Sequence, residues 1–483
     1  MNQLLATPKG VRAIAARAAF LLLASCVLVL GGCPQATSPD QSRPPKAEKW
    51  FRRAQDEYRL ARVDAAHDSV QQALDIVPAD ETVRVLAAKV ALARLEFAEV
   101  ERLLRGIHAT EALALLGRAY WYSGKLDQAA EALQAVLADP EYVDPWAKAV
   151  SQLALQGQGR KPFAMSGGLL AAVDLPRVDP TAPMYVVPLE IDGDPALALV
   201  STATAKVVLD SAARREPSWV ELRFGKRLEV RDVPALTQDL SQLSSQIGAP
   251  VKALLGANLL RQLNVTMDFR GRQFVARTFS PPPPPVASRV DLFYLRGGGM
   301  IMGTQLGSDA SGQAALFIDS ATPFTLALDQ GGWQKIGIDA TKLPPLAEDP
   351  AHKLASGTVP LLSLGALELP QVPAIFGSPI ERMERELNVD VDGILGAGML
   401  ANFRLTFADG GRVLWVEQNN IAPLRSAPPS SASPPKPTLT LPQVGAGMGG
   451  NLLAPPSSSG TGPRGTPSLA PSTPLPSPQG PTD

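Results

Sequence analysis

Two short segments of this chain share one pattern, and only one of them carries a carboxylate. In each segment an apolar, strand-like run leads into a small, hydroxyl-rich turn, which opens with Ser201 in the first copy and Asp319 in the second. A carboxylate at such a turn can serve as a general acid or base, whereas a serine hydroxyl is too weak an acid to replace it. The two copies read Leu199-Val200-Ser201-Thr202-Ala203-Thr204 and Phe317-Ile318-Asp319-Ser320-Ala321-Thr322.

The similarity continues downstream in the same order, so the two segments belong to a duplicated unit. Each copy has a glycine turn, then a Val-Pro pair, then an apolar-Gly-Ala segment and a final strand. We expect Gly256 and Gly396 in the apolar segments to be structural, because glycine lets two backbones pack closely. The matching pieces are Phe224-Gly225 and Leu364-Gly365, Val233-Pro234 and Val372-Pro373, Leu255-Gly256-Ala257 and Leu395-Gly396-Ala397, and the strands 264–269 and 404–407.

At these residues the chain resembles the aspartic protease superfamily, specifically the retropepsin-like domains of bacterial proteins, duplicated as in the two lobes of pepsin. The family pattern is two apolar residues and Asp-Thr/Ser-Gly, then a flap hairpin, then an apolar-Leu-Gly segment behind the active-site loop. The resemblance runs from about Met184 to about Glu417 and implies an all-β bilobal domain. This chain departs from the pattern at Ser201, which replaces the first Asp, and at Ala203 and Ala321, which replace Gly.

The resemblance implies a chemistry that needs two acids. An aspartic protease holds two carboxylates together so that they share one proton and activate a water between them. With Ser201 opposite Asp319, the repulsion that keeps one acid protonated is missing, and we expect little or no peptide hydrolysis by a single chain. Asp319 is then either the surviving catalytic acid or, as we favour, a structural carboxylate held by backbone amides and the hydroxyls of Ser320 and Thr202.

Three alternatives would restore catalysis. Val208-Leu209-Asp210-Ser211-Ala212 also fits the family triplet, so Asp210 is a minor candidate for the first acid, although it falls just past its strand. Two chains could pair Asp319 with its symmetry mate, but the tethered first lobe occupies that interface. Ser201 could act as a nucleophile only with a positioned base, and none of the three histidines, His67, His108 and His352, lies in the first lobe.

The residues before the duplicated unit predict a helical repeat domain over residues 47–160. They are rich in Ala, Leu, Glu, Arg and Gln, with apolar residues at three- and four-residue spacing. They repeat with a period near the ~34 residues of a tetratricopeptide unit, and we expect three repeats. Such a stack either binds a peptide or partner helix on its concave face or serves as a spacer. The packing positions are Trp50, Ala54, Ala66, Val70, Ala73 and Pro78 in one copy, Ala87, Ala88, Ala91 and Leu104 in a degenerate copy, and Leu116, Gly117, Tyr120, Gly124, Ala129, Leu133, Val136 and Pro140 in the clearest copy.

Changes in composition along the chain indicate the other domain boundaries. We expect a multidomain fold, in which the all-α repeats are followed by an all-β part with a first lobe at 180–280 and a second at 290–420. A hairpin is expected where Val186 to Ile191 meet the turn Asp192-Gly193-Asp194. Five prolines lie in a stiff connector at 281–289. Residues 424–483 are rich in Pro, Ser, Gly and Thr and cannot bury enough apolar surface to fold.

The N-terminus reads as a bacterial lipoprotein leader over residues 1–32. A basic region precedes an apolar stretch that is short for a membrane span and ends at Leu30-Gly31-Gly32-Cys33, which resembles a lipobox. We expect diacylated Cys33, with 33–46 as a tether, at the outer membrane because Pro34 rather than Asp follows the cysteine. A second box ending at Cys26, an ordinary secretory leader and an N-terminal anchor are the alternatives.

Charge and residue types exclude several function classes. The 45 Lys and Arg balance 46 Asp and Glu, which argues against a nucleic-acid binder, since such a protein needs a concentrated basic face. No cofactor or metal is expected, because the histidines are scattered and Gly297 to Gly299 lack phosphate-loop spacing. The leading hypothesis is a lipid-anchored cell-envelope protein that binds polypeptide through its repeats and inter-lobe cleft without cleaving it. The alternative is an active aspartic-type endopeptidase using Asp319 with Asp210 or a dimer mate.

Overall fold

The computed structural model describes residues 43–177, 183–309, 312–346 and 354–418. The predicted leader (1–32), the lipidated Cys33, most of the tether and the tail (424–483) lie outside the described residues.

Helical hairpins form the N-terminal part of the fold. Helices α1 and α2, α3 and α4, and α5 and α6 pair as three antiparallel hairpins, and α7 packs on α6. Asp80 and Asp144 cap the N-termini of α3 and α7 by accepting hydrogen bonds from backbone N–H groups. This arrangement is the predicted helical repeat domain, which begins two residues early at Pro45. The helices are α1 (Pro45–Arg59), α2 (Val63–Ile76), α3 (Glu81–Ala93), α4 (Phe97–Leu104), α5 (Thr110–Ser123), α6 (Leu126–Leu137) and α7 (Pro145–Gln156).

The first lobe is a seven-stranded sheet. Its strand β6 pairs with both β3 and β7, so the sheet curls back on itself. The predicted hairpin is present as β3 and β4, joined by Asp192 and Gly193, whose φ values of 50° and 92° suit the two-residue turn that matches strand twist. In sheet order the strands are β1 (Ala164–Gly167), β7 (Leu228–Gln238), β5 (Val207–Asp210), β8 (Val251–Gly256), β4 (Asp194–Ser201), β3 (Val186–Ile191) and β6 (Ser218–Phe224).

A twelve-stranded sheet forms the second lobe and continues into the first. The two halves join where β18 pairs with β9, and the hydroxyls of Thr406 and Thr266 meet there at 2.9 Å. In sheet order the strands are β15 (Ala355–Leu364), β16 (Leu367–Phe376), β14 (Leu326–Leu328), β17 (Gly393–Gly396), β13 (Gln313–Asp319), β12 (Gly299–Gln305), β11 (Ser288–Leu295), β19 (Val413–Gln418), β18 (Phe403–Ala408), β9 (Thr266–Asp268), β10 (Gln273–Arg277) and β2 (Leu170–Asp174).

Short helices complete the β domain. Two of them, α9 and α12, follow directly after Gly256 and Gly396 and so mark the same point in each lobe. The helices are α8 (Ser241–Ile247), α9 (Ala257–Gln262), α10 (Gln330–Lys335), α11 (Ile380–Leu387) and α12 (Ala397–Leu400), with 3₁₀ turns η2 (Ala340–Lys342) and η3 (Asp409–Gly411).

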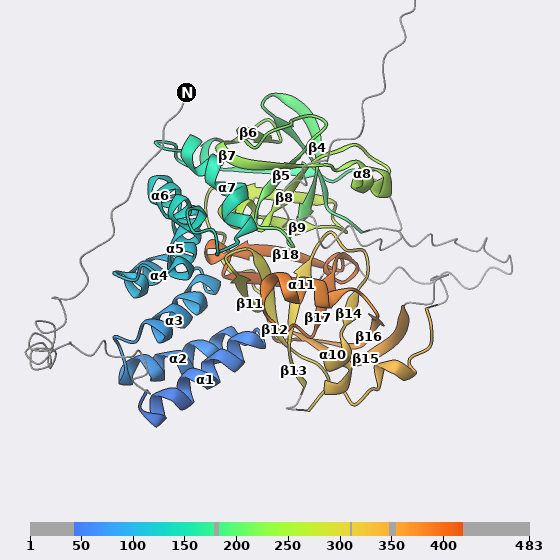
Figure 1. The fold of residues 1–483 in the computed structure, drawn as a ribbon. Coiled ribbons are helices and arrows are strands. Elements are labelled where there is room, and N and C mark those ends of the chain that lie inside the picture. Colours follow the sequence, from blue (N-terminus) through green and yellow to red (C-terminus); the bar gives the residue numbers. More distant parts are fainter. Residues whose placement is uncertain (1–42, 178–182, 310–311, 347–353, 419–483) are drawn as a thin grey trace, which may run out of the picture.

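The helical repeats lie along one side of both lobes (Figure 1). Residues from α2 and α3, such as Ala66 and Val90, share a buried apolar cluster with Phe317 and Leu387 of the second lobe. Residues from α5 to α7 share another cluster with Ala205 of the first lobe. The repeats therefore contact each lobe through a different part of the stack, and the observed fold is multidomain, all-α followed by all-β.

Two boundaries differ from the sequence-based expectation. The first lobe begins before residue 180, because β1 and β2 precede it and pair with β7 and β10. These strands have only four and five residues, too few for a clear alternating pattern. The connector is also shorter than 281–289, since β11 begins at Ser288.

Candidate functional site

Ser201 and Asp319 occupy equivalent places in the two lobes. Ser201 ends β4, where it lies opposite Gly256 of the parallel strand β8, and Asp319 ends β13, where it lies opposite Gly396 of β17. The turns that follow are fixed alike, because the N–H of Ala257 donates to Thr204 O and the N–H of Ala397 donates to Thr322 O, both at 2.7 Å. The lobes thus present the serine and the aspartate from matching turns.

Reciprocal hydrogen bonds hold the two turns together. The backbone N–H of Ser320 donates to Thr202 Oγ1 at 2.9 Å, and the N–H of Thr202 donates to Ser320 Oγ at 3.1 Å. Each hydroxyl also donates across the interface, Thr202 Oγ1 to Ile318 O and Ser320 Oγ to Val200 O, both at 2.8 Å. Thr202 and Ser320 are almost fully buried, so these bonds lock the lobes in register at the candidate site.

Asp319 is a single acid in a partly buried position. Its Oδ1 accepts from the N–H of Ala321 at 2.9 Å, and its Oδ2 accepts from the Thr322 hydroxyl. Burial raises the pKa of the Asp319 carboxyl, and these two hydrogen bonds oppose the rise. Among the described residues, no charged neighbour contributes to the shift. Within the described ranges, no second acid contributes to the environment of this carboxylate.

The Ser201 hydroxyl has no hydrogen-bond partner within the described part of the chain, although it is fully buried. A hydroxyl without a base beside it is not activated as a nucleophile. An unsatisfied buried hydroxyl also costs stability, so Ser201 is not explained by structural hydrogen bonding.

Gly256 and Gly396 leave room for the backbone of the turns. A Cβ at Gly256 would lie 2.2 Å from Lys206 O, and a Cβ at Gly396 would lie 2.1 Å from Phe324 O. Both contacts are with backbone, which cannot swing aside, so these glycines support the site by permitting close packing.

Gly396→Ala is expected to lower the free energy of unfolding by about 1 to 3 kcal/mol or more, because the added methyl overpacks a backbone contact. Denaturant unfolding monitored by tryptophan fluorescence measures the change. Gly303→Ala is the matched control, since a Cβ at Gly303 of β12 would meet nothing within 4 Å. Equal stability of the two variants would contradict the assigned role of Gly396.

Asp210 does not lie with Ser201 and Asp319. It ends β5, and the strand register makes β5 the counterpart of β14, so Asp210 corresponds to Asp329. Its carboxylate accepts from the N–H groups of Ala212 at 3.3 Å and Leu240 at 3.4 Å and lies 3.4 Å from Lys252 Nζ. Asp329 likewise caps α10. Asp210 is therefore a turn carboxylate in this structure.

The hairpins that the resemblance placed over the site lie elsewhere. At the tip of the β15–β16 hairpin, Ser288 Oγ donates to Leu364 O at 2.6 Å, and Ser288 begins β11 at the end remote from Asp319. At the tip of the β6–β7 hairpin, a Cβ on Gly225 would lie 3.2 Å from Ala172 O of β2. Both tips pack on the twelve-stranded sheet, so neither hairpin takes the place over the Asp319 turn that the family pattern gives to a flap.

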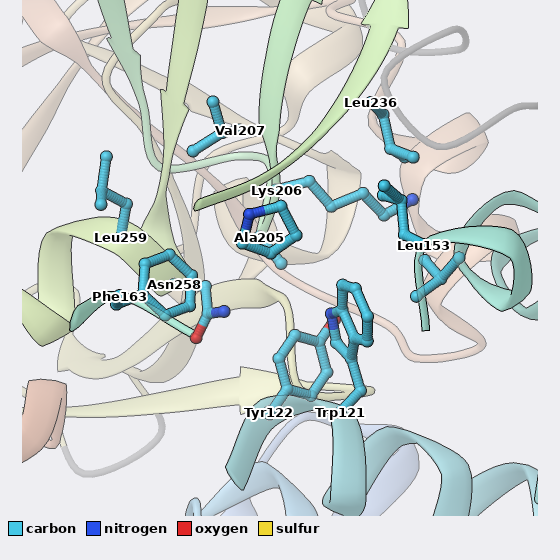
Figure 2. Close-up of a pocket in the computed structure, with 12 residues that line it drawn as sticks. Trp121, Tyr122, Leu153, Phe163, Ala205, Lys206, Val207, Leu236, Asn258 and Leu259 are labelled. Atoms are coloured by element: carbon cyan, nitrogen blue, oxygen red, sulfur yellow. The ribbon is translucent and has the colours of Figure 1, made fainter. Parts of the chain in front are cut away.

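The loop after Ser201 packs tightly on the repeats. Figure 2 shows Trp121 and Tyr122 of α5 facing Ala205, Lys206 and Asn258 of the first lobe. The cavity between them is only about 10 Å³, room for about one water. Burial lowers the pKa of Lys206 to about 8. This contact is an interface between domains and not a ligand pocket.

A much larger open groove, about 680 Å³, lies between the repeats and the second lobe. Helices α1, α3 and α5 and the α6–α7 loop form one wall, and α11 and Arg296, in the turn between β11 and β12, form the other. Its volume falls within the ~300–1,000 Å³ typical of ligand sites. The groove joins side chains far apart in sequence.

Sequence reasoning missed the groove's polar residues. Arg118 and Asp144 form a bidentate ion pair at 2.7 and 3.0 Å with both side chains buried, and Tyr58 and Tyr142 face the groove. One sequence feature could have indicated the groove, namely the three glycines that follow Arg296. They let this turn approach the repeats, because a Cβ at Gly297, where φ is 77°, would lie 2.4 Å from the Tyr122 ring.

Two solved structures are weakly similar to parts of this chain. One is a retropepsin-like aspartic protease from Rickettsia conorii, 18% identical, covering 27% of this chain and 90% of that one with a TM-score of 0.20. Another is the first TPR of Spaghetti (RPAP3), solved with an HSP90 peptide, 17% identical, covering 23% of this chain and 92% of that one with a TM-score of 0.22. No family model and no curated protein matches this chain. Neither likeness assigns an activity.

The described residues include no group of three His, Cys, Asp or Glu side chains arranged to bind a metal ion. The same residues include no helix of the length and apolarity needed to cross a bilayer.

Proposed function

We propose that this chain is a lipid-anchored protein of the bacterial cell envelope that binds polypeptide without cutting it. Diacylated Cys33 would hold it at the outer membrane, and the helical repeats together with the degenerate bilobal domain would face the partner. The lipobox-like end of the leader supports the anchor, and the balanced charge supports a protein partner over a nucleic acid.

The proposal that the chain does not cleave polypeptide rests on one observation: Ser201 occupies in the first lobe the position that Asp319 occupies in the second. The lobes are locked in register by the Thr202 and Ser320 hydrogen bonds, so the turns are placed for two-acid chemistry, yet one acid is absent. A lone carboxylate cannot act as base and supply the proton in the same step. Asp210 is engaged at another strand end, and strands β9, β10 and β2 of the first lobe already continue the second lobe's sheet, where a second chain would have to pair.

The binding part is supported by the groove between the repeats and α11. It combines exposed apolar surface, such as Val143, which is 84% exposed, with charged and tyrosine side chains. This mixture suits an extended polypeptide, which presents both apolar and polar groups.

The proposal is tested with the full chain and a permanently unfolded protein, reduced and carboxymethylated α-lactalbumin. We expect a saturable complex by fluorescence anisotropy and no new fragments by mass spectrometry between pH 3 and pH 7. Cys33→Ala is expected to move the chain from the membrane to the soluble fraction. Pepstatin-sensitive cleavage that Asp319→Asn abolishes would establish the endopeptidase alternative instead.

A further inference from the structure

Ion pairs neutralise much of the charge in the groove, but two of its cations, Arg296 and Arg385, form no ion pair with a described residue. No described carboxylate forms an ion pair with Arg296, whose side chain is exposed to the groove. The other groove charges that form no ion pair with a described residue lie together on α11, which carries both signs. The paired groups are Arg59 with Asp390, Lys89 with Glu111 at 2.6 Å, and Arg118 with Asp144 at 2.7 Å.

Two tyrosines of the repeats, Tyr58 and Tyr142, line the same groove as Arg296. Burial raises the pKa of Tyr58 to about 12, and the positive charges of Arg296 and Arg118 oppose the rise. Burial also raises the pKa of Tyr142, and Arg296 again opposes it. A carboxylate bound in this groove would therefore have the Arg296 guanidinium as a charged donor, and the groove also offers tyrosine hydroxyls.

The backbone at Arg296 is not one that arginine favours. Its φ is 51°, in the left-handed region, in a turn continued by Gly297 at 77°. Glycine or asparagine would adopt this conformation at lower cost. The turn thus presents the Arg296 side chain to the groove, although its left-handed backbone conformation is strained.

We propose that Arg296 binds an acidic side chain of an extended peptide lying in this groove. The inference rests on the proposed function and names the chemistry that the groove selects. Apolar residues beside the acid would contact Leu115, Val143 and Leu387, which line the groove. A side-chain carboxylate fits better than a C-terminal one, because the α7 N-terminus, where free N–H groups would hold a chain end, is already capped by Asp144.

The test uses labelled peptides of sequence Ser-Leu-Leu-X-Leu-Leu-Ser with an amidated C-terminus and Glu, Gln or Lys at X. A fourth peptide has Gln at X and a free C-terminal carboxylate. The full chain is expected to bind the Glu peptide about tenfold more tightly than the Gln amide, as a charge-assisted hydrogen bond predicts. Arg296→Asn, which tolerates positive φ, is expected to reduce this preference to less than twofold, and Arg296→Lys to retain part of it.

Arg385→Gln is the matched control, since it removes a cation of α11 that lines the same groove and forms no ion pair with a described residue. It should leave the preference for Glu intact. Loss of the preference in Arg385→Gln but not in Arg296→Asn, or equal binding of the free-acid and Glu peptides, would overturn the assignment. So would the absence of binding by all four peptides. In each of these cases, binding of unfolded α-lactalbumin would still support the proposed polypeptide-binding function. Failure to bind α-lactalbumin would contradict that function as well.

Discussion

Ser201→Asp is expected to produce a chain that cleaves unfolded protein at acidic pH, where the native chain does not. The substitution places a second carboxylate at the turn that matches Asp319, in lobes already held in register by Thr202 and Ser320. Burial already raises the pKa of Asp319, and a second acid beside it would raise the pKa of one member of the pair further. The singly protonated pair is then populated in mild acid, and cleavage should rise at least about 10²-fold above the native chain.

Release of fragments from carboxymethylated α-lactalbumin, followed from pH 3 to pH 7, measures this gain. The double variant Ser201→Asp with Asp319→Asn should be as inactive as the native chain. Ser201→Ala serves as the folding control and should be at least as stable as the native chain, because it removes a buried hydroxyl that has no partner among the described residues. If folded Ser201→Asp cleaves nothing at any pH, the missing acid is not what prevents catalysis.

Arg118→Met is expected to lower the free energy of unfolding by about 3 to 5 kcal/mol. Arg118 and Asp144 are each only 6% exposed, and removing one partner of a buried ion pair leaves an uncompensated charge. Burial raises the pKa of Asp144, but Arg118, together with the N–H of Ala147 and the charge of Arg296, holds it below its ordinary value. Arg118 also lies 4.5 Å from the Trp146 ring, so the variant loses a cation–π contact as well. Denaturant unfolding followed by circular dichroism at 222 nm measures the loss.

Arg52→Met provides the comparison, because Arg52 pairs with Glu48 on the surface of α1 with its side chain 74% exposed. An exposed helix pair of this kind contributes about 0 to 1 kcal/mol. Adding Asp144→Asn to Arg118→Met should recover part of the loss, since asparagine can still cap α7 while the buried charge is removed. A loss for Arg118→Met no larger than that for Arg52→Met would show that the buried pair is not stabilising.

Local patterns predicted the parts of the fold that depend on local physics. The spacing of small and apolar residues indicated the helical hairpins because that spacing determines which helix faces pack. Asp192-Gly193 indicated a hairpin because this pair adopts positive φ readily. The duplicated segments aligned Ser201 with Asp319 through their strands and glycines, and the observed register places these residues at matching positions.

The features that the sequence did not indicate depend on contacts between residues far apart in the chain. The two hairpin tips pack on the shared sheet through Ser288 and Ala172, and nothing near either hairpin encodes that direction. Arg118 and Asp144 are 26 residues apart, and neither side chain shows from its neighbours that it will be buried. Arg296 precedes three glycines. The structure explains them, because a Cβ at these positions would come into close contact with Tyr122, Ala205 and Leu387, which lie far away in the sequence.

The twelve-stranded sheet makes the halves of this molecule mechanically inseparable. Its pairing of β18 with β9 crosses from one lobe to the other. A protease that cleaved the proline connector would therefore break the peptide chain between the lobes but leave the hydrogen bonds between β18 and β9 in place. A separately expressed C-terminal half would instead present β18 as a bare edge, which invites aggregation or the capture of a foreign strand.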